Sequence, residues 1–95
     1  MAIKSITFTT PKGNVNKSPR KVSKTNKDEA EWISTGGNFT VVFDESPFAN
    51  SVFIIPSGGS VCSGPPKVNA DLDKPYKYTA FGPNGSTDPI IIVTK

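Results

Sequence analysis

Few side chains in this sequence could do chemistry, and their types exclude most of the common mechanisms. The chain has no histidine and a single cysteine, Cys62. A thiol nucleophile needs a neighbouring base, usually histidine, to form the thiolate, and one cysteine cannot form an internal disulfide. We therefore expect Cys62 to be a small, semi-buried filler residue, with an exposed thiol that dimerises under oxidation as the alternative.

Carboxylate pairs are the next candidates, because two carboxylates in different environments can act as acid and base. Glu29 and Glu31 fall on one face of a predicted strand, and Asp44 and Glu45 follow the end of another. Nothing in the sequence places any of them in an apolar pocket opposite a second acid, so we interpret them as solubilising surface. The chain is not expected to be an enzyme, and a site built from lysine, aspartate and serine is the remaining catalytic alternative.

Metal and phosphate sites are equally weakly indicated. The spacing of Asp71 and Asp73 resembles the start of a calcium loop, but the required glycine and closing glutamate do not follow. The glycine-rich segments Pro56-Ser-Gly-Gly-Ser and Gly82-Pro-Asn-Gly-Ser lack the lysine and the following helix of a phosphate-binding loop. We expect turns at all of these places and no cofactor.

Positive charge is concentrated near the beginning of the chain. Seven of the eleven lysines and arginines, and none of the eight acids, lie in residues 1–27. This asymmetry makes the segment a candidate binding site for a polyanion, either nucleic acid or acidic polysaccharide, although it lacks the aromatic residues on which single-stranded bases stack. The alternative is an edge strand that lysines protect from aggregation. The candidate polyanion-binding residues are Lys17, Arg20, Lys21, Lys24 and Lys27.

The elements that would position these residues are short strands. Apolar and polar residues alternate, or apolar residues run together, in short segments separated by turns rich in the nine prolines and eight glycines. The predicted strands are Ile3–Thr9, Arg20–Thr25, Glu29–Thr35, Phe39–Phe43, Ser51–Ile55, Tyr76–Phe81 and Pro89–Thr94, with a further short strand near Cys62. Seven or eight strands at this spacing predict an all-β fold, a single antiparallel Greek-key β-sandwich over residues 1–95 with a basic, loop-rich segment at 11–27.

Two parts of the sequence resemble the plastocyanin-like, blue-copper (cupredoxin) family. They are the stretch Phe39-Thr-Val-Val-Phe-Asp-Glu45 and the closing Tyr76-Lys-Tyr with its hydrophobic strand Ile90-Ile-Ile-Val93. With the tryptophan strand before them, they span about residues 20–94. The resemblance implies a cupredoxin-like sandwich, and an immunoglobulin-like sandwich is the alternative.

The same resemblance implies that the family's copper site is lost. The positions that match the family's two histidines, cysteine and axial methionine are occupied by Phe39, Pro83, Ala80 and Asp88. A blue-copper centre requires two imidazoles, a thiolate and a weak axial ligand, so we expect no copper. We predict instead that Phe39 packs against Ala80 and near Pro83, converting the site into core.

These observations favour a non-catalytic interaction module as the function. A docking patch at the former copper end would consist of Phe48, Phe81 and Pro83, and the expected partner is another protein, with the chain a monomer or weak dimer. No segment approaches the ~20 apolar residues of a membrane helix, so no membrane insertion is expected. No secretory signal is visible, which favours the cytoplasm, although the resemblance allows an exported mature form. The predicted core is Trp32, Phe39, Val41, Phe43, Ile54, Tyr78, Ile90 and Ile92.

Overall fold

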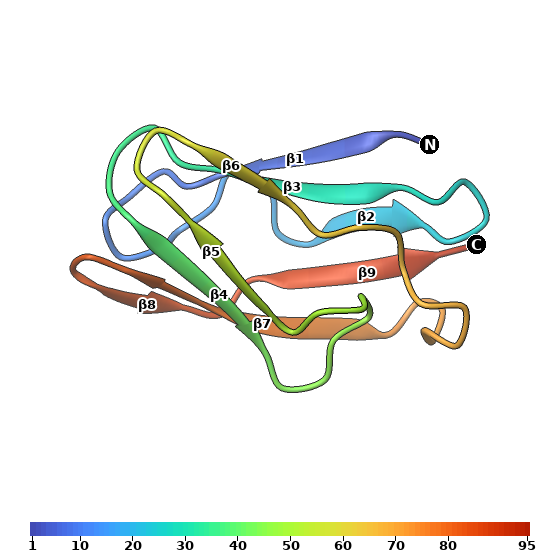
Figure 1. The fold of residues 1–95 in the computed structure, drawn as a ribbon. Helices are drawn as coiled ribbons and strands as arrows, with labels where there is room; N and C mark the ends of the chain where they lie inside the picture. Colours follow the sequence, from blue (N-terminus) through green and yellow to red (C-terminus); the bar gives the residue numbers. More distant parts are fainter.

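Nine strands and no helix make up the computed structural model, which describes residues 1–95 (Figure 1). The all-β prediction is therefore confirmed. The strands are β1 (Ile3–Thr7), β2 (Arg20–Ser23), β3 (Glu29–Ile33), β4 (Phe39–Phe43), β5 (Val52–Ile55), β6 (Ser60–Cys62), β7 (Pro75–Gly82), β8 (Gly85–Thr87) and β9 (Ile90–Thr94). The short strand expected near Cys62 is β6, and the count exceeds the expected seven or eight because β8, with only three residues, follows a segment that was expected to be a turn.

The strands form two sheets. One sheet has the order β1-β3-β6, and the other has the order β2-β9-β7-β4-β5, with β8 added on β7. The chain passes repeatedly between the two sheets, for example from β5 to β6 through the turn at residues 56–59 (Figure 1). β4 and β7 are neighbours at the centre of the larger sheet. Phe39 lies on β4, Ala80 lies on β7, and Pro83 follows β7 directly.

The expected all-antiparallel pairing is wrong for two strand pairs. β1 pairs parallel with β3, and β2 pairs parallel with β9, while the remaining ladders are antiparallel. Parallel neighbours need a crossover connection rather than a tight hairpin. For β1 and β3, the connection passes through the other sheet: after β1 the chain forms β2 in the larger sheet and then returns to the smaller sheet as β3.

The core between the sheets is aromatic. The Trp32 side chain is fully buried and packs against four other rings, Phe43, Phe48, Phe53 and Tyr78, with centroid distances of 4.9 to 6.4 Å. Its indole N–H donates a 3.2 Å hydrogen bond to the Tyr78 hydroxyl, so the one polar atom of the tryptophan is satisfied inside the core. Burial raises the pKa of Tyr78 to about 12.

Strand alternation placed most of the predicted core correctly and failed on two strands. Trp32, Phe39, Val41, Phe43 and Tyr78 are buried as expected. Ile54 is 69% exposed, and its neighbours Phe53 and Ile55 are buried instead. Ile90 and Ile92 are only half-buried, whereas Ile91 and Val93 are fully buried. In each case the strand is apolar throughout, so the pattern does not say which face points inward, and a shift of one residue exchanges the faces.

One buried carboxylate holds the turn between β2 and β3. Asp28 is 3% exposed and accepts hydrogen bonds from the backbone N–H of Ser23 (2.9 Å) and Ala2 (3.1 Å) and from the Asn26 amide (2.6 Å). Burial alone would raise the pKa of Asp28, but these three donors stabilise the carboxylate and leave its pKa below the ordinary value of 3.8. The residue thus ties the start of the chain to the β2–β3 turn.

Candidate binding surfaces

An aromatic pair fills the space at the Phe39 end of β4, where the sequence resemblance predicted a lost copper site. Phe39, the first residue of β4, is 2% exposed, and its ring stacks on Phe8 with centroids 4.0 Å apart and planes 2° apart. Gly82 lies against the same ring, since a Cβ at Gly82 would lie 2.8 Å from Phe39 Cε1 and 2.2 Å from the carbonyl oxygen of Pro11. Only glycine fits there. Neither Phe8 nor Gly82 was among the sequence-predicted partners of Phe39.

The other three positions that match lost ligands have different surroundings. Ala80 is fully buried on the same face of the sheet as Phe39, and its methyl group faces Gly13, where a Cβ would lie 3.3 Å away. Pro83 is exposed and lies near Phe39, because a Cβ at Gly37 would be 3.1 Å from Pro83 Cγ and 3.7 Å from the Phe39 ring.

Asp88 is exposed, and its Oδ1 accepts a 3.3 Å hydrogen bond from the Thr79 hydroxyl. Of the four positions, only this one carries a side chain that could coordinate a metal. Across the whole chain, no three or more cysteine, aspartate and glutamate side chains are grouped closely enough to hold a metal ion.

The five basic residues are spread over a loop, a strand and a turn. Lys17 precedes β2, Arg20 and Lys21 lie on β2, and Lys24 and Lys27 lie in the turn after it. Neighbouring residues of a strand point to opposite faces, so Arg20 and Lys21 do not share a surface. Arg20 is half-buried, with an Nε atom that has no hydrogen-bond partner. The Lys24 ammonium group donates to the carbonyl oxygen of Val68 at 2.9 Å. The fold therefore divides the basic segment between different faces.

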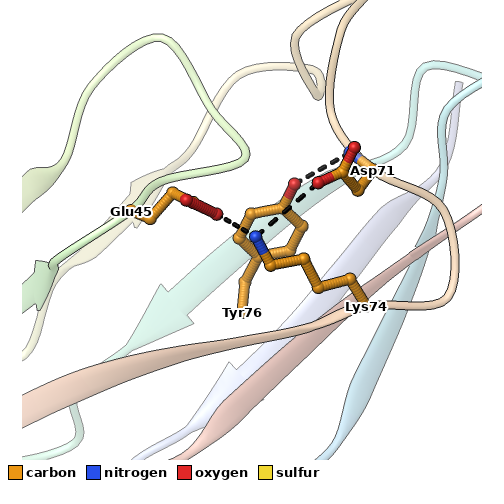
Figure 2. Close-up of polar contacts among 4 residues, drawn as sticks. All are labelled: Glu45, Asp71, Lys74 and Tyr76. Carbon is orange, nitrogen blue, oxygen red and sulfur yellow. Dashed lines mark hydrogen bonds and ion pairs between the residues drawn. The ribbon is translucent and has the colours of Figure 1, made fainter.

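A lysine–carboxylate cluster lies at the opposite end of the sheet from Phe39 (Figure 2). The Lys74 ammonium group pairs with the Glu45 carboxylate, lies 3.6 Å from Asp71 Oδ2 and sits 5.1 Å above the Tyr76 ring. The Tyr76 hydroxyl accepts a 2.8 Å hydrogen bond from the backbone N–H of Asp71. These contacts connect the loop after β4 with the loop before β7.

The cluster is arranged as a structural link rather than as a catalytic pair. The hydrogen bond to Glu45 raises the pKa of Lys74, and the charges of Glu45 and Asp71 act in the same direction. A lysine that acts as nucleophile or base needs a lowered pKa. The Lys74 and Glu45 side chains are also 41% and 66% exposed, so water screens both charges.

Cys62 is exposed at the edge strand β6, and the expectation of a semi-buried filler is wrong. Burial of the sulfur atom, together with the charges of Glu31 and Glu29, raises the pKa of the thiol. The pairing of β6 with β3 places Cys62 opposite Glu31 and accounts for the contribution of that charge, which is smaller than the contribution of burial. A thiol with a raised pKa is a poor nucleophile.

An exposed apolar surface covers the outer side of β5, β4 and β7. We call it the apolar face and define it as Thr40, Val42, Val52, Ile54 and Phe81. The strand register places Ile54, Thr40 and Phe81 in one row and Val52 beside Val42 in the next. Val52, Ile54 and Phe81 are 51%, 69% and 49% exposed. Large apolar side chains gathered in this way commonly mark interaction sites, whereas single exposed ones do not.

The structure exposes only two of the three residues of the predicted docking patch. Phe81 and Pro83 are exposed, but Phe48 is 1% exposed and packs edge-on against Trp32. Phe48 also lies beyond the far end of β4 from Phe39, where it bridges to Pro66 in the loop after β6. Phe48 therefore cannot belong to a surface at the Phe39 end of β4, where Phe81 and Pro83 lie. Ile54, which the sequence pattern placed in the core, is exposed in the same row as Phe81, with Thr40 between them.

Comparison of the chain with protein-family models, curated proteins and solved structures finds no significant match. The fold contains no helix that is long and apolar enough to cross a bilayer.

Proposed function

We propose that the chain is a non-catalytic protein-binding module, built on a copper-free cupredoxin-like sandwich, that docks a partner protein on the apolar face. The observation that carries the proposal is the row that crosses β5, β4 and β7, in which the exposed side chains of Ile54 and Phe81 lie on either side of Thr40. Protein partners bind preferentially at such apolar centres, where aromatic residues contribute much of the affinity.

The cupredoxin-like part of the proposal rests on the position of the residues that match lost ligands. Phe39 opens β4, Ala80 lies on the adjacent β7, and Pro83 follows β7 at the same end of the sheet. A metal site on this framework would need ligands from these strands and the following loop. The stacked Phe8 and Phe39 rings supply apolar packing there instead. The remaining clusters in the chain act as links between loops and favour no catalytic role.

Site-specific photo-crosslinking tests the proposal in the cells that make the protein. A photoreactive phenylalanine analogue at Phe81 should give discrete protein adducts after irradiation. Val68 provides the matched control, because it is 93% exposed and apolar but is not part of the apolar face. Adducts from position 81 and none from position 68 are the expected result. Equal labelling at both positions, or no protein adduct from position 81, would contradict the proposal.

A further inference from the structure

The apolar face ends at β5, which is an unpaired edge of the larger sheet. The Phe43 N–H donates to the Ser51 carbonyl oxygen at 2.8 Å. Bonded and non-bonded pairs alternate along an antiparallel ladder, so Ser51, Phe53 and Ile55 direct their backbone groups toward β4. The backbone N–H and C=O groups of Val52 and Ile54 consequently point away from β4, to the open edge. The same two residues carry exposed apolar side chains.

This edge lacks the features that normally keep an edge strand from pairing. Edge strands are usually protected by lysines, by inward-pointing charges or by a covering segment. β2, the other end of the same sheet, carries Arg20 and Lys21 and is protected in this way. By contrast, the sequence contains no charged residue from Ser46 to Pro66, which includes β5, β6 and the turns beside them. The edge of β5 therefore presents free hydrogen-bonding groups and apolar side chains without charge.

We infer that β5 pairs with β5 of a second copy of the chain, in antiparallel orientation about a two-fold axis at Phe53. This inference specifies a partner for the β5 part of the apolar face, Val52 and Ile54, and so rests on the proposed function, while Phe81, two strands away, stays outside the contact. An axis at Phe53 places Val52 of each copy opposite Ile54 of the other. Both residues have outward-facing backbone groups, so the two pairs exchange hydrogen bonds. In this register each outward-facing residue of β5 meets an apolar residue that also has a free N–H and C=O.

The absence of charge favours a second copy over a different partner. A two-fold interface brings the same surface patch of both copies together, so any charge near the axis would face an equal charge. The segment from Ser46 to Pro66 avoids this repulsion completely. It also offers no charge that would select a partner of opposite sign. The short strand, four residues long, gives a contact smaller than the ~800 Å² per partner of stable complexes, so the dimer should be weak and concentration-dependent.

Sedimentation equilibrium of the purified chain, from micromolar to millimolar concentration, tests the inference. The weight-average mass should rise from that of a monomer toward twice that value. Ile54→Lys should lower the association constant by about tenfold or more, because two apolar pairs are lost and two cations are brought together. Val68→Lys adds the same charge at another exposed apolar residue and should leave association unchanged. Thermal unfolding of both variants checks that they are folded.

Amide hydrogen exchange supplies a second readout of the same contact. The N–H groups of Val52 and Ile54 should exchange fast in dilute protein and become protected as the mass rises. A mass that stays monomeric at every concentration, or a dimer that survives Ile54→Lys without protection of these two amides, would overturn the inference. If the chain is monomeric but Phe81 still gives adducts with a different protein, the proposed function stands and only the identity of the partner is wrong. Absence of both results would contradict the two proposals together.

Discussion

Replacing Phe39 by alanine should strongly destabilise the protein, because its buried ring fills the core at the start of β4. The ring is 2% exposed and stacks on Phe8 at 4.0 Å. Emptying a buried phenylalanine site costs about 3–5 kcal/mol, and the lost ring stacking lies within that range. In a domain of this size each kcal/mol lowers the melting temperature by roughly 4–8 °C. Phe39→Ala should therefore be close to unfolded at physiological temperature.

Urea unfolding followed by tryptophan fluorescence measures this effect, since Trp32 is the only tryptophan and lies fully buried in the core. Phe81→Ala is the matched control, because Phe81 is on the neighbouring strand but 49% exposed, and it should cost less than about 1 kcal/mol. If Phe39→Ala does not fold, Phe39→Leu should fold with a loss of about 1–2 kcal/mol, since it keeps part of the apolar volume. Equal urea midpoints for Phe39→Ala and the parent protein would refute the assignment of Phe39 to a packed plug.

Three further predictions concern other parts of the molecule. Asp28→Asn should reduce the free energy of unfolding at pH 7 by about 1–3 kcal/mol, because the backbone N–H groups of Ser23 and Ala2 lose a charged acceptor. Since the pKa of Asp28 is lowered by folding, its stabilisation is complete above the unfolded-state pKa and is lost as the pH falls through the folded-state pKa. The difference between parent and variant should thus shrink below about pH 4, and a constant difference from pH 7 to pH 2.5 would contradict the assigned hydrogen bonds. Tyr78→Phe should cost about 1–2 kcal/mol, because the Trp32 indole N–H loses its acceptor, and ultraviolet titration should show Tyr78 ionising near its pKa of about 12, well after an exposed tyrosine. Purified protein should stay colourless with cupric salts, and an intense blue charge-transfer band would show that a copper site had been overlooked.

The strands that alternate strictly could be assigned from the sequence, and the uniformly apolar ones could not. Phe39–Phe43 has Thr40 between two large apolar residues, which fixes the buried face as Phe39, Val41 and Phe43. Val52–Ile55 has no such polar marker, and its correct face follows only from the register against β4. The exposed Val52 and Ile54, which complete the apolar face, could therefore not be predicted from the pattern.

Burial that depends on loops and on contacts between distant segments could not be predicted from the sequence either. Phe48 lies in a loop, and its burial depends on the distant segment around Pro66 that covers it. The stacking of Phe8 on Phe39 joins the residue after β1 to the first residue of β4, which no local pattern indicates. Nothing in the sequence distinguishes Asp28 from the other acidic residues, but in the structure three hydrogen-bond donors hold it as a buried structural residue. Gly82 ends β7, and nothing in the sequence indicates that an aromatic ring lies against it.

The central claim is that the protein binds through its apolar face and not through its basic segment. Retention on a heparin column across a salt gradient tests this directly, because binding to a polyanion by several cations weakens steeply with salt. The fold divides the five basic residues between different faces, so we expect elution at low salt and little change on replacing Lys17 and Lys21 by glutamine. Retention to high salt that these two substitutions abolish would contradict the account and make the basic segment the functional surface.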